Sequence, residues 1–339
     1  MTRPVLTFFN NKGGVGKTML AYHVAWMLNE LGIATIVLDL DPQANLTASF
    51  LDDDRVEELW RDPVRRTVYG ALAPLFEGEG GIGDPYVEEI ASNLWLVPGD
   101  LLLSGTEQEL SLAWPGSLEQ QVRALRVTAA FATVAQRAAE QAYADVILVD
   151  VGPNLGAVNR AAMVASDHVV IPIRPDLYSL QGLRNLGPTL DRWRQGWADI
   201  KGRTSRPDLQ LPSGEMRPRG YVVLQHGTRV DRVVGAYDRW LRRVPAEYRR
   251  SVLGQSAEHA PLPAQDAHCL GMIKHYYSLA PLGQEARKPV FLLRSADGAI
   301  GAHQYAVREA YGHFEALTRR LLEVVRPAGR GTDEDGELP

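Results

Sequence analysis

Short, almost continuously apolar runs alternate along this chain with longer segments whose apolar residues recur every three or four positions. Runs rich in Val, Ile and Leu predict strands, and the helical period predicts helices. The predicted strands are Val5–Phe9, Ala34–Leu38, Leu94–Val97, Val146–Val151, His168–Ile173 and Tyr221–Gln225. The predicted helices include Thr18–Leu31, Leu118–Tyr143, Leu180–Trp193, Arg229–Arg243 and His303–Val325.

This alternation predicts the fold class. Strands that are apolar on both faces and separated by helices indicate a parallel sheet covered by helices on both sides. We therefore predict an α/β fold with a doubly wound, mostly parallel sheet. Right-handed crossovers place the carboxyl ends of such strands at one edge, where ligands of these folds bind. Residues that carry chemistry should thus lie directly after strands.

The length of 339 residues is sufficient for a large buried core, and residues 1–326 are predicted to form a single domain. Two stretches interrupt the pattern. Segment 52–86 carries acids, Pro and Gly, and segment 197–219 is rich in Arg, Pro, Ser and Gly, so both are predicted to be irregular insertions. The acidic tail 327–339 is predicted to be disordered.

Segment 11–18, with the sequence NKGGVGKT, lies between the first predicted strand and the first predicted helix. Glycines let a backbone approach an anion closely, and the start of a helix attracts phosphate. Lys17 would reach the β- and γ-phosphates, and the Thr18 hydroxyl would ligate Mg²⁺. Asn11 stands where the generic P-loop pattern has glycine, and Lys12 is an additional lysine, so this loop is a variant of that pattern.

Two later strands end in carboxylates. Asp39 and Asp41 follow the strand at 34–38, and strand alternation places them on the same side. Paired carboxylates beside a phosphate would hold hydrated Mg²⁺ and orient an attacking water, although two acids also suit the cap of a turn before Pro42. Asp150 ends the strand at 146–150 and precedes a Gly-Pro turn, as in a Walker B strand. In series, the three segments predict one nucleotide site.

Charge is distributed unevenly along the chain. Segment 184–250 holds fourteen Arg and one Lys against seven acids, which makes it +8, whereas the whole chain is −5 and the remainder therefore −13. Such segregation is typical of a DNA-binding face, with ordinary solvated helix faces as the alternative. The candidate DNA-binding residues are Arg219, Arg239, Arg242 and Arg243. The tryptophans among these arginines, Trp193, Trp197 and Trp240, are predicted to pack rather than to stack on bases.

Composition excludes several classes of protein. No apolar run approaches the roughly 18 residues of a membrane span, and the N-terminus lacks the layout of a signal peptide. Cys269 is the single cysteine, so neither an internal disulfide nor a cysteine metal cluster is expected. The spacing of His259, His268 and His275 fits no common metal-ligand pattern. A cytoplasmic protein is the expected class.

The three site segments resemble one family. NKGGVGKT at 11–18, DLDPQAN at 39–45 and ILVDVGPNLG at 147–156 are similar to the ParA/Soj branch of the deviant Walker A ATPases, which belong to the ParA/MinD superfamily of P-loop NTPases. Segments 96–110 and 171–183 also resemble that family, and weaker similarity continues to the helix from His303. The motifs are specific up to about residue 183.

The resemblance implies roles for individual residues and ATP with Mg²⁺ as cofactors. Lys12 would reach across an ATP-sandwich homodimer to the partner's phosphates, which would couple nucleotide state to assembly. Asp41 would position the hydrolytic water, and the implied metal-site residues are Thr18, Asp39 and Asp150. The implied nucleotide-binding residues are Lys12, Gly13, Gly14, Val15, Gly16, Lys17, Thr18, Met19 and Pro175, and the implied catalytic residues are Lys12, Lys17 and Asp41. Gly152 departs from the family, which usually has proline there.

The leading hypothesis is a cytoplasmic, nucleoid-associated ATPase that binds DNA nonspecifically and partitions plasmids or chromosomes, or positions another cargo. A ParB-like protein would stimulate its slow hydrolysis. One alternative is a ParA-like switch for another cargo or a defence or regulatory module. A less favoured alternative is a MinD-like membrane-surface ATPase, because acids at 333–335 follow the last predicted helix and would oppose anionic lipid. The nitrogenase-reductase type is excluded, since it needs several cluster cysteines.

Overall fold

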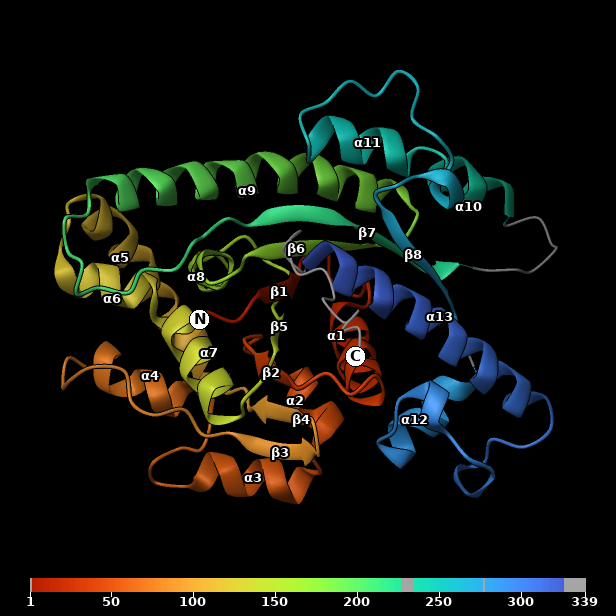
Figure 1. Cartoon of the computed structure of the whole chain (residues 1–339), viewed down its shortest axis with the longest axis horizontal. Helices are drawn as coiled ribbons and strands as arrows, with labels where there is room; N and C mark the ends of the chain where they lie inside the picture. Colours follow the sequence, from red (N-terminus) through yellow and green to blue (C-terminus); the bar gives the residue numbers. More distant parts are fainter. Residues whose placement is uncertain (1, 227–233, 277, 326–339) are drawn as a thin grey trace, which may run out of the picture.

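The computed structural model describes residues 2–226, 234–276 and 278–325, and a single sheet lies at the centre of this part of the chain (Figure 1). The eight strands follow the order β3-β4-β2-β5-β1-β6-β7-β8, and all neighbours are parallel except β3 and β4. The strands are β1 (Val5–Phe8), β2 (Thr35–Asp39), β3 (Glu88–Ala91), β4 (Leu94–Val97), β5 (Val146–Asp150), β6 (His168–Ile173), β7 (Arg217–His226) and β8 (Cys269–Lys274). The predicted fold class is confirmed.

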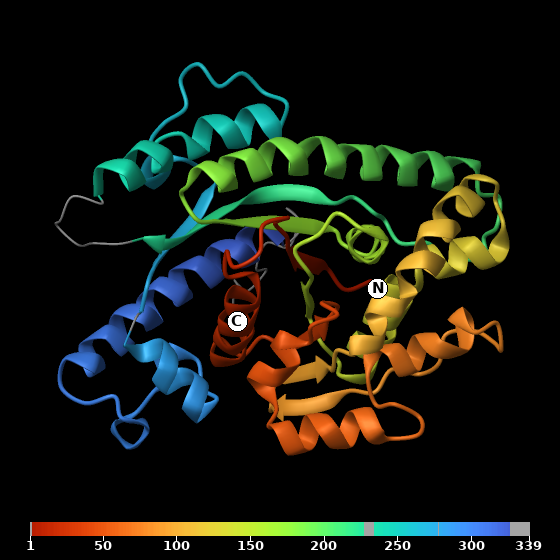
Figure 2. The same ribbon diagram turned by 180° about the vertical axis from the view of Figure 1, so that it is seen from behind.

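Helices cover both faces of the sheet. The helices are α1 (Lys17–Glu30), α2 (Asn45–Phe50), α3 (Asp53–Arg61), α4 (Val68–Phe76), α5 (Glu107–Leu118), α6 (Val122–Thr128), α7 (Ala130–Gln141), α8 (Ala157–Val164), α9 (Leu177–Arg203), α10 (Val234–Leu241), α11 (Val244–Ser251), α12 (Leu279–Ala286) and α13 (Ala302–Val325). Short 3₁₀ helices are η1 (Leu101–Thr106), η2 (Pro263–Gln265), η3 (Val290–Leu292) and η4 (Ser295–Asp297). Both views place α9 along one side of β6 and β7, with α1 and α13 on the other (Figures 1 and 2).

Alternation along the strands divides the core into two layers. In β1, Leu6 and Phe8 join the layer formed with α1, α2, α3, α12 and α13. Val5 and the following Phe9 join the layer formed with α4 to α11. All four side chains are at most 2% exposed, because a parallel sheet with helices on both faces buries successive residues equally. Each such side chain contributes roughly 1.5–3 kcal/mol of burial free energy.

The prediction of an irregular segment 52–86 is wrong, because this segment contains α3 and α4. The Asp52 side chain caps α3 by accepting a hydrogen bond from the backbone N–H of Arg55 (2.8 Å). Thr67 caps α4 in the same way, and Val68 and Leu72 of α4 are fully buried. The acids that suggested a loop are therefore capping and surface residues of short helices.

The prediction of an irregular insertion at 197–219 is also largely wrong. Helix α9 continues to Arg203, and β7 already begins at Arg217, so the irregular stretch is 204–216. Trp197 is fully buried, and its indole Nε1 donates to the Pro212 carbonyl oxygen (3.1 Å). The connection thus folds back over Trp197, and Gly214, with φ of +59°, makes room for the indole. This contact between distant residues has no signal in local periodicity.

Other predicted elements differ in their bounds. The helix expected at 118–143 is split, since α5 ends before Gln120, which adopts φ of +61°, and α6 and α7 follow. Strands β3 and β8 were not predicted, because their short sequences, EEIA and CLGMIK, lack a clear apolar run. Part of the helix expected at 229–243 and the tail expected at 327–339 lie outside the described residues.

Candidate nucleotide-binding site

The phosphate loop connects β1 to α1, as its sequence predicts. Gly14 and Gly16 adopt φ of +69° and +97°, a region that residues with a Cβ rarely occupy. A Cβ on Gly16 would also lie 2.9 Å from Leu224 Cδ1. The positive φ therefore favours glycine at position 16, at the start of α1, and a Cβ there would also displace the Leu224 side chain.

Lys17 is the first residue of α1 and is only 7% exposed. Burial lowers the pKa of its ammonium group, whereas the carboxylates of Asp150 and Asp41 act in the opposite direction. The ammonium lies 3.4 Å from the Lys12 carbonyl oxygen. A partly desolvated cation at a helix start is well suited to a phosphate, because charge-assisted hydrogen bonds strengthen when water is excluded.

Three carboxylates converge beside this loop. Strands β2 and β5 are neighbours, and their register places Asp39 directly beside Asp150. Both side chains are fully buried, and Asp41 is 6% exposed. Asp39 Oδ2 accepts hydrogen bonds from the Thr47 backbone N–H (2.8 Å) and hydroxyl (2.7 Å). The fold therefore brings together the acids that the sequence places in two separate segments.

Burial changes the protonation of these carboxylates. Desolvation raises the pKa of Asp39 to about 6 and that of Asp150 to about 8, with the charge of Asp39 as the next contribution to Asp150. The Thr18 hydroxyl and the Lys17 ammonium act in the opposite direction on Asp150. Both carboxylate oxygens of Asp150 are buried, and apart from the Thr18 hydroxyl that acts on the pKa they have no hydrogen-bond partner among the described residues. Burying such oxygens costs free energy unless a ligand binds to them.

These residues fit Mg²⁺ bound together with a nucleotide. Mg²⁺ prefers one or two carboxylates, hydroxyls, water and phosphate oxygens to an all-protein cage. Within the described ranges, no three His, Cys, Asp or Glu side chains form a metal cage of their own. Thr18, Asp150 and Asp39 would hold the ion from the protein side, and the bound ion would neutralise phosphate charge.

Lys12 contacts its own chain in this structure. Its ammonium forms an ion pair with Asp176 and lies 3.4 Å from Ser179 Oγ. It also lies 5.8 Å from the centre of the Tyr178 ring. Asp176 in turn caps α9 by accepting a hydrogen bond from the Ser179 backbone N–H (2.7 Å). The contact of Lys12 with a partner's phosphates stays a prediction.

The turn after β5 lies against the acids. A Cβ on Gly152 would be 3.3 Å from Asp41 Oδ1, so the glycine that departs from the family pattern leaves room beside this carboxylate. The buried Asn159 side chain donates to the carbonyl oxygens of Gly152 (2.8 Å) and Asn154 (2.7 Å). The turn is therefore held by the Asn159 side chain of α8 and lies beside Asp41.

Sequence reasoning did not identify the supporting residues Thr47, Asp176 and Asn159. Asp176 contacts Lys12 from 164 residues away, and apolar periodicity does not signal the bond from Thr47 to Asp39 or from Asn159 to Gly152. Two residues implied by the resemblance lie at the edges of the site. Met19 is 37% exposed beside the loop, and Pro175 is buried between β6 and α9, and their nucleotide contacts stay predictions.

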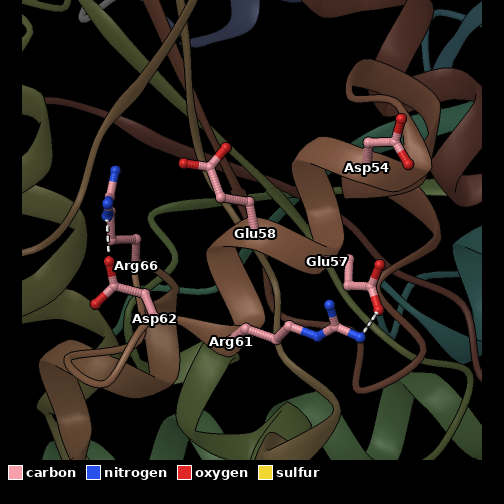
Figure 3. Close-up of a pocket in the computed structure, with 6 residues that line it drawn as sticks. All are labelled: Asp54, Glu57, Glu58, Arg61, Asp62 and Arg66. Atoms are coloured by element: carbon pink, nitrogen blue, oxygen red, sulfur yellow. Dashed lines mark hydrogen bonds and ion pairs between the residues drawn. The ribbon is translucent and has the colours of Figure 1, made fainter.

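A surface hollow elsewhere is not a second site. It lies on α3 and the turn that follows (Figure 3). Its lining residues are Asp54, Glu57, Glu58, Arg61, Asp62 and Arg66. Arg61 pairs with Glu57, and Arg66 Nε donates to Asp62 (2.6 Å), so both arginines of the hollow are already paired at the surface. Exposed pairs of this kind are ordinary solvated features.

The candidate DNA-binding arginines fall into two places. Arg239 and Arg243 lie on and just after α10, with guanidinium carbons 4.9 and 5.1 Å from the centre of the Trp240 ring. Arg242 Nε donates to Asp238 (2.7 Å). Arg219, by contrast, lies near the beginning of β7, and its Nε donates to His168 Nδ1 (3.0 Å). The structure therefore does not place Arg219 with the other three.

Other arginines of the basic segment have internal partners. Arg184 forms two hydrogen bonds with Glu247 (2.9 Å each), and Arg249 pairs with the buried Asp266. The predicted packing of the tryptophans is confirmed for Trp193 and Trp197, which are 7% and 0% exposed. Trp240 is half-buried between its two arginines, so α10 carries the clearest basic and aromatic surface in the segment.

A glycine loop between β1 and α1, a buried lysine at the helix start and a carboxylate at the end of a neighbouring strand define a P-loop nucleotide-binding protein. The family model described as "AAA domain" matches residues 3–200, and the chain belongs to this family. The resemblance to ParA/Soj-type P-loop NTPases is confirmed by the relatives that the chain matches.

Two of these relatives are bacterial. The chain is 30% identical over 182 residues to the sporulation initiation inhibitor protein Soj of Bacillus subtilis, which covers 54% of this chain and 62% of that protein. It is 30% identical over 192 residues to the chromosome partitioning protein ParA of Caulobacter vibrioides, which covers 56% and 63%. The matched region thus spans less than two thirds of either relative.

Solved structures share the fold over nearly the whole chain. Protein DIP2308 from Corynebacterium diphtheriae superposes with a TM-score of 0.70 and 25% identity, covering 95% of this chain and 98% of that chain. An ATP complex of a McdA variant from Cyanothece has a TM-score of 0.61 and 15% identity, covering 97% and 99%. The second likeness concerns the fold alone.

Proposed function

We propose that this chain is a ParA-type ATPase that binds ATP with Mg²⁺, dimerises on binding it and attaches nonspecifically to DNA. Partner-stimulated hydrolysis would then release the dimer and move plasmid, chromosome or another cargo. The observation that carries the proposal is the meeting of Lys17 with Asp39, Asp41 and Asp150 at one edge of the sheet. Binding, metal and hydrolysis functions need these groups within reach of one phosphate.

Each residue has a proposed part in the reaction. Lys17 and the loop N–H groups would hold the phosphates, and Thr18, Asp150 and Asp39 would support Mg²⁺. Asp41 is the acid nearest the turn at Gly152 and would orient the attacking water. Lys12 would complete phosphate neutralisation in the partner subunit, so that full charge compensation requires two copies.

The membrane alternative receives no support from the last described helix. The apolar side of α13, which includes Phe314, Leu317 and Leu321, is buried in the core layer with α1. A membrane-surface helix needs such a face to be free. None of the described helices is both long and apolar enough to cross a membrane.

The proposal is tested with wild-type protein, Lys17→Ala and the control Lys201→Ala, which removes a lysine remote from the loop. We expect wild-type protein and the control to bind a fluorescent ATP analogue with Mg²⁺, and Lys17→Ala to bind it at least about 100-fold more weakly. Sedimentation should show dimers with ATP and monomers with ADP.

A gel shift with nonspecific duplex DNA completes this test. ATP-dependent DNA binding would support a role in DNA partitioning. ATP-dependent dimers that do not bind DNA would favour a switch for another cargo. Unchanged nucleotide binding in Lys17→Ala would contradict the site assignment itself. A control variant that loses binding would indicate that the effect of Lys17→Ala is nonspecific.

A further inference from the structure

Helix α8 begins without a cap of its own. Its N-cap residue is Gly156, whose neighbours Ala157 and Val158 carry backbone N–H groups that no residue within the turn satisfies. The Glu107 carboxylate accepts both, with Oε1 2.5 Å from the Ala157 nitrogen and Oε2 3.0 Å from the Val158 nitrogen. A helix start is therefore completed by a side chain fifty residues earlier in the chain.

The close approach of the Glu107 carboxylate to the start of α8 explains the glycine at position 156. Its φ of −79° is open to any residue, so backbone conformation does not require glycine. A Cβ there, however, would lie 2.5 Å from Glu107 Oε1 and 3.0 Å from Asn154 Oδ1. A contact of 2.5 Å is shorter than real Cβ atoms show, so a side chain at position 156 would displace the Glu107 carboxylate.

The turn capped in this way is the one that touches Asp41. Gly152 lies beside Asp41 at its beginning, and Gly156 lies against Glu107 at its end. Between them, Asn154 Oδ1 accepts a hydrogen bond from the Gly156 backbone N–H (2.9 Å). A shift of the Glu107 end would therefore move the segment that bears on Asp41.

Glu107 is itself anchored to the other acid-bearing strand. Segment 98–106 leads from β4 to α5 and includes Gly99, whose N–H donates to Thr47 Oγ1 (2.8 Å) and where an added Cβ would lie 2.9 Å from Asp39 Cγ. The following Asp100 is 1% exposed and accepts from Arg65 Nη1 (2.8 Å). The segment that leads into Glu107 is thus packed against the carboxylate of Asp39.

We propose that Glu107 is a positioning residue for hydrolysis, which holds the turn 152–156 at the distance from Asp41 that the attacking water requires. This inference rests on the proposed ATPase function. Glu107, the first residue of α5, would thus contribute to turnover although it lies outside the phosphate-binding motifs. A purely structural cap would stabilise α8 without affecting the chemical step.

The test compares Glu107→Ala and Glu107→Gln with two controls. Glu109→Ala alters a neighbouring acid of α5 that pairs with Arg123 at the surface. Asp52→Ala removes a helix cap from α3, where the Asp52 side chain accepts one exposed hydrogen bond from the Arg55 backbone N–H. We measure hydrogen exchange at the amides of 157 and 158 without nucleotide, ATP affinity, kcat and Tm.

We expect Glu107→Ala to raise exchange at both amides about 10-fold or more and to lower kcat about 10-fold, while ATP affinity stays within about twofold. Glu107→Gln keeps one accepting oxygen and should give an intermediate kcat. Asp52→Ala should lower Tm with unchanged kcat, and Glu109→Ala should change neither exchange nor kcat.

Two results would overturn the inference. One is unchanged exchange at 157 and 158 in Glu107→Ala, and the other is a wild-type kcat in that variant despite increased exchange. A wild-type protein that binds but does not hydrolyse ATP would refute the proposed function instead, and the exchange measurement would then still decide whether Glu107 holds the turn.

Discussion

Asp150 illustrates how burial gives one side chain its chemistry. Its two buried oxygens have no partner among the described residues besides the nearby Thr18 hydroxyl, and desolvation together with the charge of Asp39 raises its pKa to about 8. The same environment lowers the pKa of Lys17. Both shifts express the absence of solvent around ionisable groups, and both would be relieved by Mg²⁺ and phosphate. A ligand-binding role accounts for this arrangement better than a stabilising one.

His23 is a second buried ionisable residue, away from the acids. Its Nδ1 lies 2.8 Å from the Met19 carbonyl oxygen, and its Nε2 accepts a hydrogen bond from the Val290 backbone N–H (3.2 Å). The ring stacks on Phe314 at 4.7 Å. Burial lowers the pKa of His23 to about 4, so the ring is neutral and joins α1 to the C-terminal part of the fold.

A pH effect follows from this lowered pKa. Unfolded His23 takes up a proton below about pH 6.5 and folded His23 only near pH 4, so its contribution to stability is lost as pH falls between these values. By pH 5 the loss is about 2 kcal/mol. We expect Tm to fall more between pH 7 and pH 5 in wild-type protein than in His23→Gln, which does not titrate. Parallel thermal-denaturation profiles would contradict this assignment.

At the scale of elements, α10 presents the basic surface. Arg239 and Arg243 flank Trp240, whereas Arg242 is engaged with Asp238. Arginines without a carboxylate partner keep their full charge for phosphate, and a paired arginine must first give up its partner. Of the four candidate arginines, Arg239 and Arg243 beside Trp240 are therefore the ones most available to DNA phosphates.

The corresponding prediction concerns the order of three variants. Arg239→Glu and Arg243→Glu should each weaken binding to nonspecific duplex DNA about 10-fold and reduce the salt dependence by roughly one ion. Arg242→Glu should have a smaller effect. Arg319→Glu on α13, which alters an exposed arginine paired with Glu315, is the control. Fluorescence anisotropy at several salt concentrations provides the measurement, and equal affinities in all four variants would exclude α10.

Helices and strands with a complete local apolar pattern were predictable from the sequence. Those that depend on contacts with distant residues were not. Strand β4 has the predicted bounds, and α1 and α13 begin within one residue of theirs, because each carries a complete local pattern. Strand β3 is polar and pairs with β4 only at one edge of the sheet. The second half of α9 depends on the burial of Trp197 under Pro212, which periodicity in the helix does not contain.

At the scale of the whole molecule, Lys12 links the site to assembly. In the single chain its ammonium pairs with Asp176 at the start of α9. Under the proposed function, ATP-dependent dimerisation would exchange this partner for a phosphate of the second subunit. The exchange is favourable only when the phosphate charge exceeds what Lys17 and Mg²⁺ neutralise within one chain.

Two variants should separate assembly from turnover. Lys12→Ala should bind ATP with nearly wild-type affinity but fail to dimerise, because the charge that reaches the partner is missing. Asp41→Ala should form ATP-dependent dimers and release phosphate at least about 100-fold more slowly. Sedimentation and phosphate-release assays measure the two properties. Normal dimers in Lys12→Ala, or normal hydrolysis in Asp41→Ala, would refute the respective role.

The sequence by itself determined the phosphate loop, the strand ends that carry Asp39 and Asp150, and the α/β class, because glycine conformation and apolar periodicity are local properties. Only the tertiary structure decided which side chains meet. It placed Asp39 beside Asp150 and Glu107 at the start of α8. These partners are far apart along the chain, and packing of whole helices and strands, rather than any local pattern, brings them into contact.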